Sequence, residues 1–170
     1  MVNKYPFEEG YYGFYFEGNL REAIHAFKFK GRKEVGRYLV KLIADKINSI
    51  SERFDVIIPI PVTEKRLKER GFNQSFIIAE EIGRITGSPV YPSILYKRRD
   101  TEDQFLLDKD KRRTNLKDAF AVKEKDRIKE RMVLLIDDLF TTGATAREAT
   151  GVILKSGVKG VIFFALARTP

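Results

Sequence analysis

The chain alternates between short apolar runs and longer segments in which apolar residues recur every three or four positions. The short runs are typical of strands buried on both faces of a parallel sheet, and the recurring spacing is typical of amphipathic helices. The predicted strands are residues 55–60, 133–136 and 161–167, and the predicted helices are residues 19–30, 33–50, 76–85 and 144–155. This alternation predicts an α/β fold with a mostly parallel central sheet flanked by helices.

Two regions carry weaker strand patterns. Aromatic residues crowd positions 5–16, and the alternation over residues 12–16 after a turn predicts an edge hairpin that packs its rings on the core. A platform on which nucleobases stack is the alternative. Residues 90–96 and 120–122 are further strand candidates, and Pro92 favours an edge position for the first of them.

The stretch V-L-L-I-D-D-L-F-T-T-G-A-T, residues 133–145, organises the rest of the chain. Its apolar strand is followed directly by Asp137 and Asp138 and then by small residues. The next helix opens with Thr145 and Glu148 at the spacing of a capping box. A strand that turns into a helix leaves backbone N–H groups unpaired, and small residues let a ligand approach them. Because a helix N-terminus favours negative charge, the turn predicts a phosphate site.

Asp137 and Asp138 cannot hold that phosphate themselves, because like charges repel. Two carboxylates at this place suit vicinal hydroxyls, a metal ion or a cationic transition state. A sugar phosphate satisfies both halves, with its hydroxyls towards the aspartates and its phosphate in the turn. A generic strand–turn–helix with a charged turn is the alternative. A Walker nucleotide site is excluded, because the chain contains no G-x-x-x-x-G-K-[ST] motif.

A second cluster of charge follows the strand at residues 55–60. Arg66 and Arg70 lie four positions apart, which places them on one face of a helical turn. Two guanidinium groups on one face suit a pyrophosphate, because each can bind two phosphate oxygens at once. A solvated charged turn is the alternative.

The composition excludes several classes of protein but does not identify a ligand. The 170 residues suit one domain, and 32 Lys and Arg against 24 Asp and Glu give a net charge of +8. Such a surplus is expected of a protein that binds nucleic acid or a small polyphosphate, and a merely soluble basic surface would look the same. The absence of cysteine excludes disulfides and thiolate metal sites. No apolar run is long enough for membrane insertion, and the first residues lack the apolar core of a signal peptide, which favours a cytoplasmic protein.

Residues 133–145 closely resemble the phosphoribosyl-pyrophosphate (PRPP) loop of type I phosphoribosyltransferases, in which a hydrophobic strand, two acidic residues and an apolar pair precede T-T/S-G-x-T. Further stretches run in the order seen in the ComF family of competence proteins, which is similar to the phosphoribosyltransferase half of amidophosphoribosyltransferases. These stretches are residues 25–31, 59–61, 70–75, 98–104, 113–115 and 166–168. The likeness covers about residues 11–168, and R-G-F-N-Q at residues 70–74 is its most specific part.

The resemblance implies a type I phosphoribosyltransferase fold in one domain, residues 1–170, with a hairpin-and-helix hood at residues 1–31 and a core at residues 51–170. It also implies a Mg²⁺-dependent glycosyltransferase that transfers phosphoribose from PRPP to an acceptor the pattern does not identify. In several bacteria the family acts in the uptake of single-stranded DNA during natural transformation. Single-stranded DNA or DNA-import proteins are therefore expected as further partners, and an oligomer is compatible with the sequence.

The same resemblance assigns roles to individual residues. The expected catalytic residues are Asp137, Asp138 and Arg70, and the two aspartates would also hold Mg²⁺, directly or through PRPP and water. The residues expected at the PRPP 5-phosphate are Thr141, Thr142, Gly143, Ala144 and Thr145. The residues expected at the pyrophosphate are Pro61, Val62, Arg66, Arg70 and Lys28. The residues expected on a flexible loop that closes over the ligand are Arg98, Arg99, Gln104, Arg112 and Arg113.

Two departures from the family pattern leave the activity open. Many ComF proteins begin with a cysteine-rich zinc-binding segment, whereas this chain contains no cysteine. A base-reading hood of the kind found in purine and pyrimidine phosphoribosyltransferases is not recognisable in residues 4–31. A non-enzymatic PRPP-binding adaptor of the DNA-import machinery is therefore the alternative to an enzyme, and a plain nucleic-acid binder is a third hypothesis.

Overall fold

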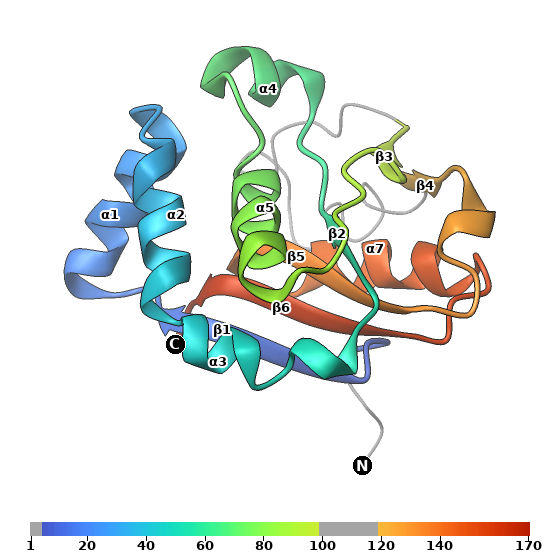
Figure 1. The fold of residues 1–170 in the computed structure, drawn as a ribbon. Coiled ribbons are helices and arrows are strands. Elements are labelled where there is room, and N and C mark those ends of the chain that lie inside the picture. Colours follow the sequence, from blue (N-terminus) through green and yellow to red (C-terminus); the bar gives the residue numbers. More distant parts are fainter. Residues whose placement is uncertain (1–4, 99–118) are drawn as a thin grey trace.

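The computed structural model describes residues 5–98 and 119–170, which form a parallel sheet with helices on both faces (Figure 1). The strand order in this sheet is β1-β6-β5-β2, and every neighbouring pair is parallel. The strands are β1 (Glu9–Tyr15), β2 (Val56–Pro59), β5 (Met132–Phe140) and β6 (Gly160–Arg168). Parallel pairing brings the carboxyl ends of these strands to a single edge of the sheet.

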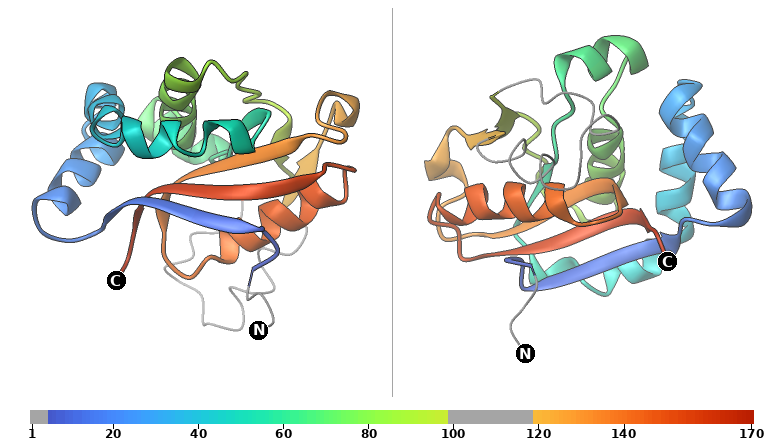
Figure 2. Two further views of the ribbon diagram at one scale, coloured as in Figure 1. Left: turned by 60° about the horizontal axis from the view of Figure 1, so that its bottom comes forward. Right: turned by 180° about the vertical axis from the view of Figure 1, so that it is seen from behind.

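The helices divide between the two faces of the sheet (Figure 2). They are α1 (Gly18–Phe29), α2 (Lys33–Leu42), α3 (Ala44–Asn48), α4 (Glu64–Arg70), α5 (Gln74–Thr86) and α7 (Ala144–Leu154), with short 3₁₀ turns η1 (Ser51–Arg53) and η3 (Lys125–Arg127). Helix α7 covers one face, and α1, α2, α3 and α5 lie on the other. Neighbouring residues of β5 pack into opposite cores: Leu134 lies in the cluster that includes α5, and Leu135 lies in the cluster that includes α7. This explains why the central strands are apolar at every position rather than at alternate ones.

The three buried strands predicted from the apolar runs are confirmed as β2, β5 and β6. The β5–α7–β6 unit is a parallel crossover, as its strand–helix–strand pattern predicts. The helix predicted over residues 33–50 is wrong as a single element, because Ile43 has non-helical backbone angles between α2 and α3. The turn redirects the chain, so that Ile47 and Ile50 reach the same core cluster as the buried face of α2.

The predicted N-terminal hairpin is also wrong. Strand β1 lies at the edge of the sheet and pairs in parallel with β6, from Glu9 opposite Ile162 to Tyr15 opposite Arg168. The edge is partly covered, because the Lys46 ammonium donates a hydrogen bond of 2.6 Å to the Tyr12 carbonyl. Sequence alternation identified the strand but not its partner, since the pairing depends on a strand at the far end of the chain.

The strand candidate at residues 90–96 is only partly confirmed. Val90 forms an isolated parallel bridge with Ile57, and a short strand begins later, at β3 (Leu95–Lys97). This strand pairs antiparallel with β4 (Phe120–Val122), which confirms the other candidate. The two form a small sheet beside the main one, at the ends of the undescribed residues 99–118.

The contact between α1 and α2 generates a stability prediction. A Cβ atom added at Gly36 would lie 2.5 Å from two ring carbons of the fully buried Phe27, whereas one added at Gly151 of α7 would meet nothing within 4 Å. We expect Gly36→Ala to lower the free energy of unfolding by about 1–3 kcal/mol through overpacking. We expect the matched Gly151→Ala to raise it by about 0.4–1 kcal/mol, because alanine restricts the unfolded chain. Urea unfolding measures both, and equal effects of the two variants would contradict the close packing of α1 on α2.

Candidate active site at the carboxyl edge of the sheet

Strand β5 carries both aspartates near its carboxyl end. The apolar run predicts a strand that ends at residue 136, but pairing with β6 continues to Phe140 opposite Arg168. Asp137 and Asp138 therefore lie inside the strand rather than in the turn after it. On the other side, β2 ends at Pro59 opposite Ile136, so β5 extends beyond this neighbour. The aspartates thus lie where the sheet is paired on one side only.

Asp137 is a buried carboxylate with two hydrogen-bond donors. Its Oδ1 accepts from the backbone N–H of Asp138 at 2.8 Å and from the Ser75 hydroxyl at 3.4 Å. Burial, followed by the negative charge of Asp138, raises the pKa of Asp137 to about 7. The N–H of Asp138, Lys28 and Ser75 act in the opposite direction without cancelling the effect of burial. A carboxyl with this pKa changes its charge near neutral pH.

Asp138 is held by a lysine from a distant part of the chain. The Lys28 ammonium lies 2.9 Å from its Oδ2, and the side chains are only 17% and 14% exposed. Helix α1 places this lysine there, because Ile24 and Phe27 are buried in the core and leave Lys28 directed along the carboxyl edge. Lys28 therefore partly compensates two adjacent negative charges.

The turn after β5 has the geometry of an anion site. Gly143 adopts φ +72° and is the N-cap of α7, which begins at Ala144. The capping box predicted at Thr145 is wrong, because Thr145 lies inside the helix. The Thr142 hydroxyl instead accepts a hydrogen bond of 3.4 Å from the Ala144 N–H. The first N–H groups of α7 point out of the helix at this turn, together with the positive end of its dipole.

Neighbouring aromatic rings exclude a side chain at Gly143, in addition to the constraint set by its φ angle. A Cβ atom there would overlap the ring of Tyr5 and approach Cζ of Phe140 to 2.8 Å. The Tyr5 hydroxyl also donates a hydrogen bond of 3.2 Å to the Thr142 carbonyl. Aromatic residues from the N-terminal segment thus support the turn from the α7 side of the sheet. The sequence indicates that these rings pack on the core, and only the structure shows which loop they support.

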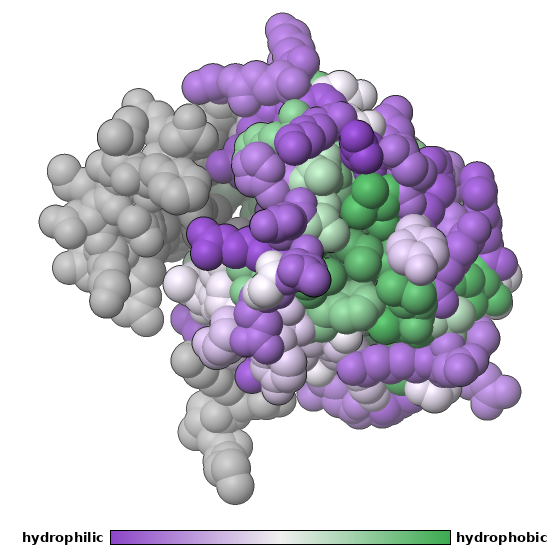
Figure 3. Space-filling view, turned by 90° about the vertical axis from the view of Figure 1, so that its left-hand side faces the viewer, coloured by the Kyte–Doolittle hydropathy of each residue, from purple (hydrophilic) through white to green (hydrophobic). Residues whose placement is uncertain are grey.

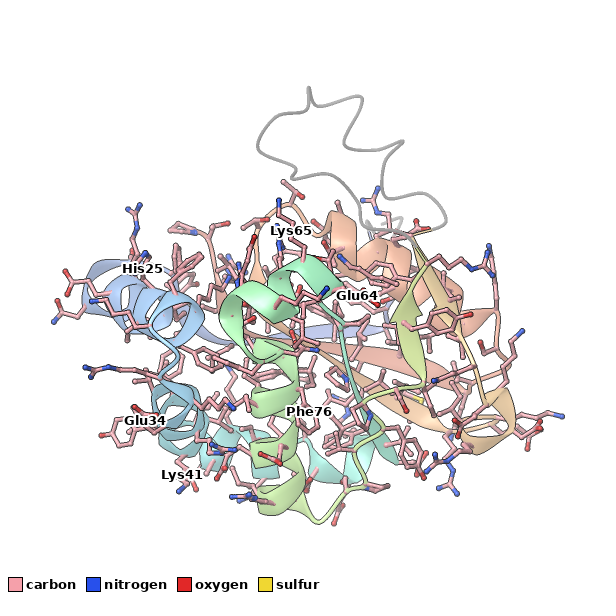
Figure 4. All side chains as sticks on the ribbon, turned by 90° about the horizontal axis from the view of Figure 1, so that it is seen from above. His25, Glu34, Lys41, Glu64, Lys65 and Phe76 are labelled. Carbon is pink, nitrogen blue, oxygen red and sulfur yellow. The ribbon has the colours of Figure 1, made fainter. Side chains whose placement is uncertain are left out.

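Helix α4 brings the two predicted arginines to the same edge. The Thr63 hydroxyl caps this helix by accepting from the Arg66 N–H at 3.2 Å, and Gly71 ends it in the left-handed conformation. Arg66 and Arg70 are half-buried and lie one turn apart. The Arg70 guanidinium donates to Gln74 Oε1 at 3.1 Å and lies 5.0 Å from the ring centroid of Phe29 on α1. Figure 4 views the molecule from above, with α1 marked by His25 and α4 marked by Glu64 and Lys65.

The R-G-F-N-Q stretch has a local structural explanation. Asn73 is the N-cap of α5, and its Oδ1 accepts from the Ser75 N–H at 3.0 Å. Its Nδ2 donates to the Ile60 carbonyl at 3.0 Å, which ties α5 to the end of β2. This anchoring places the Ser75 hydroxyl beside Asp137. Sequence reasoning missed Ser75 as a site residue, and its position shortly after the N-cap asparagine was the available signal.

The loop between β2 and α4 borders a cavity. Pro61, Val62 and Thr63 line a space of about 360 Å³ together with Lys97, the last residue of β3, and Arg98, which follows it. Predicted pyrophosphate residues and the first predicted loop arginine therefore lie around one opening. Arg99, Gln104, Arg112 and Arg113 fall outside the described residues. Within residues 5–98 and 119–170, no group of three or more His, Cys, Asp or Glu residues could hold a metal ion by itself.

Two aspartates alone are nevertheless compatible with Mg²⁺. This ion usually takes one or two carboxylates and fills its other positions with water and substrate phosphates. The donor set formed by Asp137 and Asp138 suits that mode of binding.

Among the described residues, no helix combines the length and the apolar composition of a membrane span.

Sequence comparison relates the chain to competence and DNA utilization proteins. It is 31% identical to Competence protein F of Haemophilus influenzae over 155 residues, which cover 88% of this chain and 68% of the relative. It is 30% identical to the DNA utilization protein YhgH of Escherichia coli O157:H7, of which 67% is covered. It is 31% identical to Competence protein ComFC of Bacillus subtilis, of which 60% is covered. No protein-family model matches the chain.

Structure comparison identifies the fold. The chain is similar to the glutamine PRPP amidotransferase of B. subtilis, with a TM-score of 0.52 at 18% identity, over 76% of this chain and 25% of that one. It is similar to the purine phosphoribosyltransferase of Pyrococcus horikoshii, with a TM-score of 0.51 at 18% identity, over 79% and 74% of the two chains. The fold is therefore the type I phosphoribosyltransferase fold, as predicted.

The raised pKa of Asp137 generates a prediction for the metal-free protein. Between pH 4 and pH 7 the native state binds more protons than the unfolded state, so the free energy of unfolding falls as the pH rises through this window. Asp137→Asn lacks this dependence but keeps an oxygen that accepts from the Asp138 N–H. We expect the melting temperature of Asp137→Asn minus that of the unmodified protein to become more positive from pH 5 to pH 8. Both proteins are measured in buffer that contains a metal chelator. Asp45→Asn removes an equal charge from an exposed position and serves as control. A constant difference for Asp137→Asn across this range would contradict the assignment.

Proposed function

This chain belongs to the ComF family of competence proteins, and from that premise we propose that it binds PRPP with Mg²⁺ and transfers the phosphoribosyl group to an acceptor, releasing pyrophosphate. The observation that carries the proposal is the meeting of three features at one edge. The Asp137–Asp138 pair, the N-terminal turn of α7 and the arginine face of α4 come together there. Each suits one part of PRPP.

The 5-phosphate is proposed to bind in the turn formed by Thr141, Thr142, Gly143, Ala144 and Thr145. The N–H groups of the first turn of α7 have no partners within the helix and can donate to phosphate oxygens. The left-handed Gly143 directs the chain around the anion without a side chain in the way. The threonine hydroxyls would add further donors.

The ribose hydroxyls are proposed to bind to Asp137 and Asp138. Both carboxylates sit at low exposure, so hydrogen bonds to them would be stronger than in water. In the described structure Lys28 compensates Asp138, and a bound hydroxyl or cation would take over part of this role. Lys28 would then be available for the adjacent pyrophosphate, the position expected for it from the sequence.

The pyrophosphate is proposed to lie between the Pro61–Val62 loop and the arginines of α4. Arg66 and Arg70 would bind its oxygens and compensate the charge that grows as it leaves. The acceptor's lone pair forms the new bond to the anomeric carbon while the carbon–oxygen bond breaks and its electrons depart with pyrophosphate. The anomeric carbon becomes cationic, and the two carboxylates beneath it would stabilise that charge. Mg²⁺, when bound, would neutralise the leaving group.

A second function from another class is a PRPP-binding adaptor of DNA uptake that performs no transfer. The observation that favours it is the set of names carried by the relatives, which describe competence and DNA utilization. An adaptor needs the PRPP site but not an acceptor pocket, and a scaffold can keep a ligand site after an activity is lost.

One experiment separates the two functions. Isothermal titration calorimetry with PRPP is run with and without Mg²⁺, and pyrophosphate release is then measured with purine and pyrimidine bases, ammonia and glutamine as acceptors. Binding with acceptor-dependent release supports the transferase. Binding without release from any acceptor supports the adaptor. Absence of binding under both conditions would reject both.

Asp138 generates the first binding prediction. We expect Asp138→Asn to weaken Mg-PRPP binding by roughly 10- to 150-fold, because a hydrogen bond to a charged group contributes about 1.5–3 kcal/mol. This variant leaves the Lys28 ammonium without its anionic partner at 2.9 Å, so the melting temperature of Asp138→Asn is measured in parallel to separate an effect on binding from an effect on folding. Asp126→Asn, at an exposed position, is the control. Unchanged calorimetric affinity in Asp138→Asn would contradict the role of this carboxylate.

Arg70 generates a prediction about ligand discrimination. We expect Arg70→Ala to weaken PRPP binding about 10-fold or more while leaving ribose 5-phosphate binding unchanged, since the second ligand lacks the pyrophosphate. The control is Arg131→Ala, which removes an exposed arginine at the opposite edge of the sheet. Equal losses for both ligands, measured by calorimetry, would show that Arg70 does not act on the pyrophosphate.

A further inference from the structure

Helix α2 has a second apolar face that the fold does not cover. Its inner face is buried against α1 and α5 through Gly36, Leu39 and Val40. Tyr38 and Leu42 are nevertheless 62% and 57% exposed, and Val35 is only partly buried. Figure 3, which views the side of the molecule formed by α1 and α2, shows an apolar area surrounded by polar side chains. An apolar area of this kind on a soluble domain typically marks a contact surface.

The spacing on this face is that of a helix–helix seam. Val35, Tyr38 and Leu42 are separated by three and then four positions, the pattern of successive a, d and a positions in a heptad. In this frame Glu34 and Lys41 both occupy the g position, which flanks the seam. They lie seven residues apart, or about 10 Å along the helix axis. Both side chains extend from the outer part of α2 (Figure 4).

The surface also has room for an incoming side chain. Glu34, Val35, Arg37, Tyr38 and Lys41 line a shallow groove of about 520 Å³. Arg37 is fixed at its rim by the ion pair with Glu80 of α5, 2.7 Å long. Lys41 is 64% exposed, and its ammonium lies 3.9 Å from Glu81, so most of its charge remains available to a partner.

We propose that this face binds a second copy of the chain, with the two α2 helices packed antiparallel about a two-fold axis near Tyr38. Reversing one helix against the other brings Glu34 of each copy beside Lys41 of its partner, so one patch supplies two symmetric ion pairs. A two-fold axis requires such self-complementarity. The same reversal places Val35 near Leu42 of the other copy and the two tyrosines at the centre.

The charges favour this arrangement over its competitors. In a parallel pair the g position would face the e position of the partner helix, which here is Leu39, buried inside its own copy. An acidic partner would be repelled by Glu34, and a basic one by Lys41. Since α2 has only ten residues, the buried area is small and the dimer should be weak. This inference does not depend on the proposed activity, because α2 carries none of the residues assigned to PRPP.

Sedimentation velocity over a range of protein concentrations tests the proposal. We expect a reversible monomer–dimer equilibrium, and we expect Tyr38→Glu to weaken it by at least 10-fold. Glu34→Lys and Lys41→Glu each replace two attractive pairs with two repulsive ones, and each alone should weaken the dimer about 10-fold. Lys155→Glu, an equal change of charge at the end of α7, should leave it unaffected.

Mixing the two charge variants gives the sharpest result. In the heterodimer, the position changed by Glu34→Lys faces the position changed by Lys41→Glu, and the unchanged Lys41 of the first chain faces the unchanged Glu34 of the second. Both pairs are therefore attractive. We expect the mixture, and the double variant Glu34→Lys/Lys41→Glu, to associate as tightly as the unmodified protein. This recovery also shows that the Lys41→Glu effect does not come from its neighbour Glu81. A protein that remains monomeric at every concentration, or variants that fail to recover on mixing, would overturn the proposal.

Discussion

The arrangement of this protein depends on keeping two adjacent carboxylates near the carboxyl end of the inner strand β5. Asp137 and Asp138 follow four residues that are fully buried, and neither carboxylate can be solvated freely. Burying adjacent like charges is costly unless donors and a cation accompany them. Lys28 comes from α1, Ser75 from the first turn of α5, and an N–H from the strand itself. Elements far apart in the chain are thereby held at one edge.

The same requirement links the surrounding packing to the site. Helix α1 reaches the edge only because Ile24 and Phe27 are buried against α2, whose Gly36 gives the Phe27 ring its space. Helix α5 reaches Asp137 because Asn73 caps it and bonds to the end of β2. On the other face, Tyr5 and Phe140 close around Gly143. Residues that look structural in isolation therefore position the groups proposed to bind PRPP.

Helix α2 connects this architecture to assembly. One face carries the packing on which the position of Lys28 depends, and the opposite face carries the seam of Val35, Tyr38 and Leu42. A dimer formed through this seam would use none of the residues proposed to bind PRPP. Association and ligand binding would then be separate properties of one small domain.

The sequence alone predicted the parts of the protein that rest on local patterns. Apolar runs identified β2, β5 and β6, because a strand covered on both faces of the sheet is apolar at nearly every position and therefore stands out in the sequence. The order of residues 133–145 identified the fold family, and the spacing of Arg66 and Arg70 predicted that they share a helical face. These features are encoded within a few positions of one another.

The tertiary structure decided everything that required distant residues to meet. The parallel pairing of β1 with β6, the ion pair between Lys28 and Asp138, and the approach of Ser75 to Asp137 all join segments separated by long stretches of chain. The raised pKa of Asp137 depends on burial by those segments, and so cannot be inferred from two neighbouring aspartates. The break at Ile43 likewise reflects the core that Ile47 and Ile50 must reach. Local spacing determines which residues share a face, whereas only packing determines what that face meets.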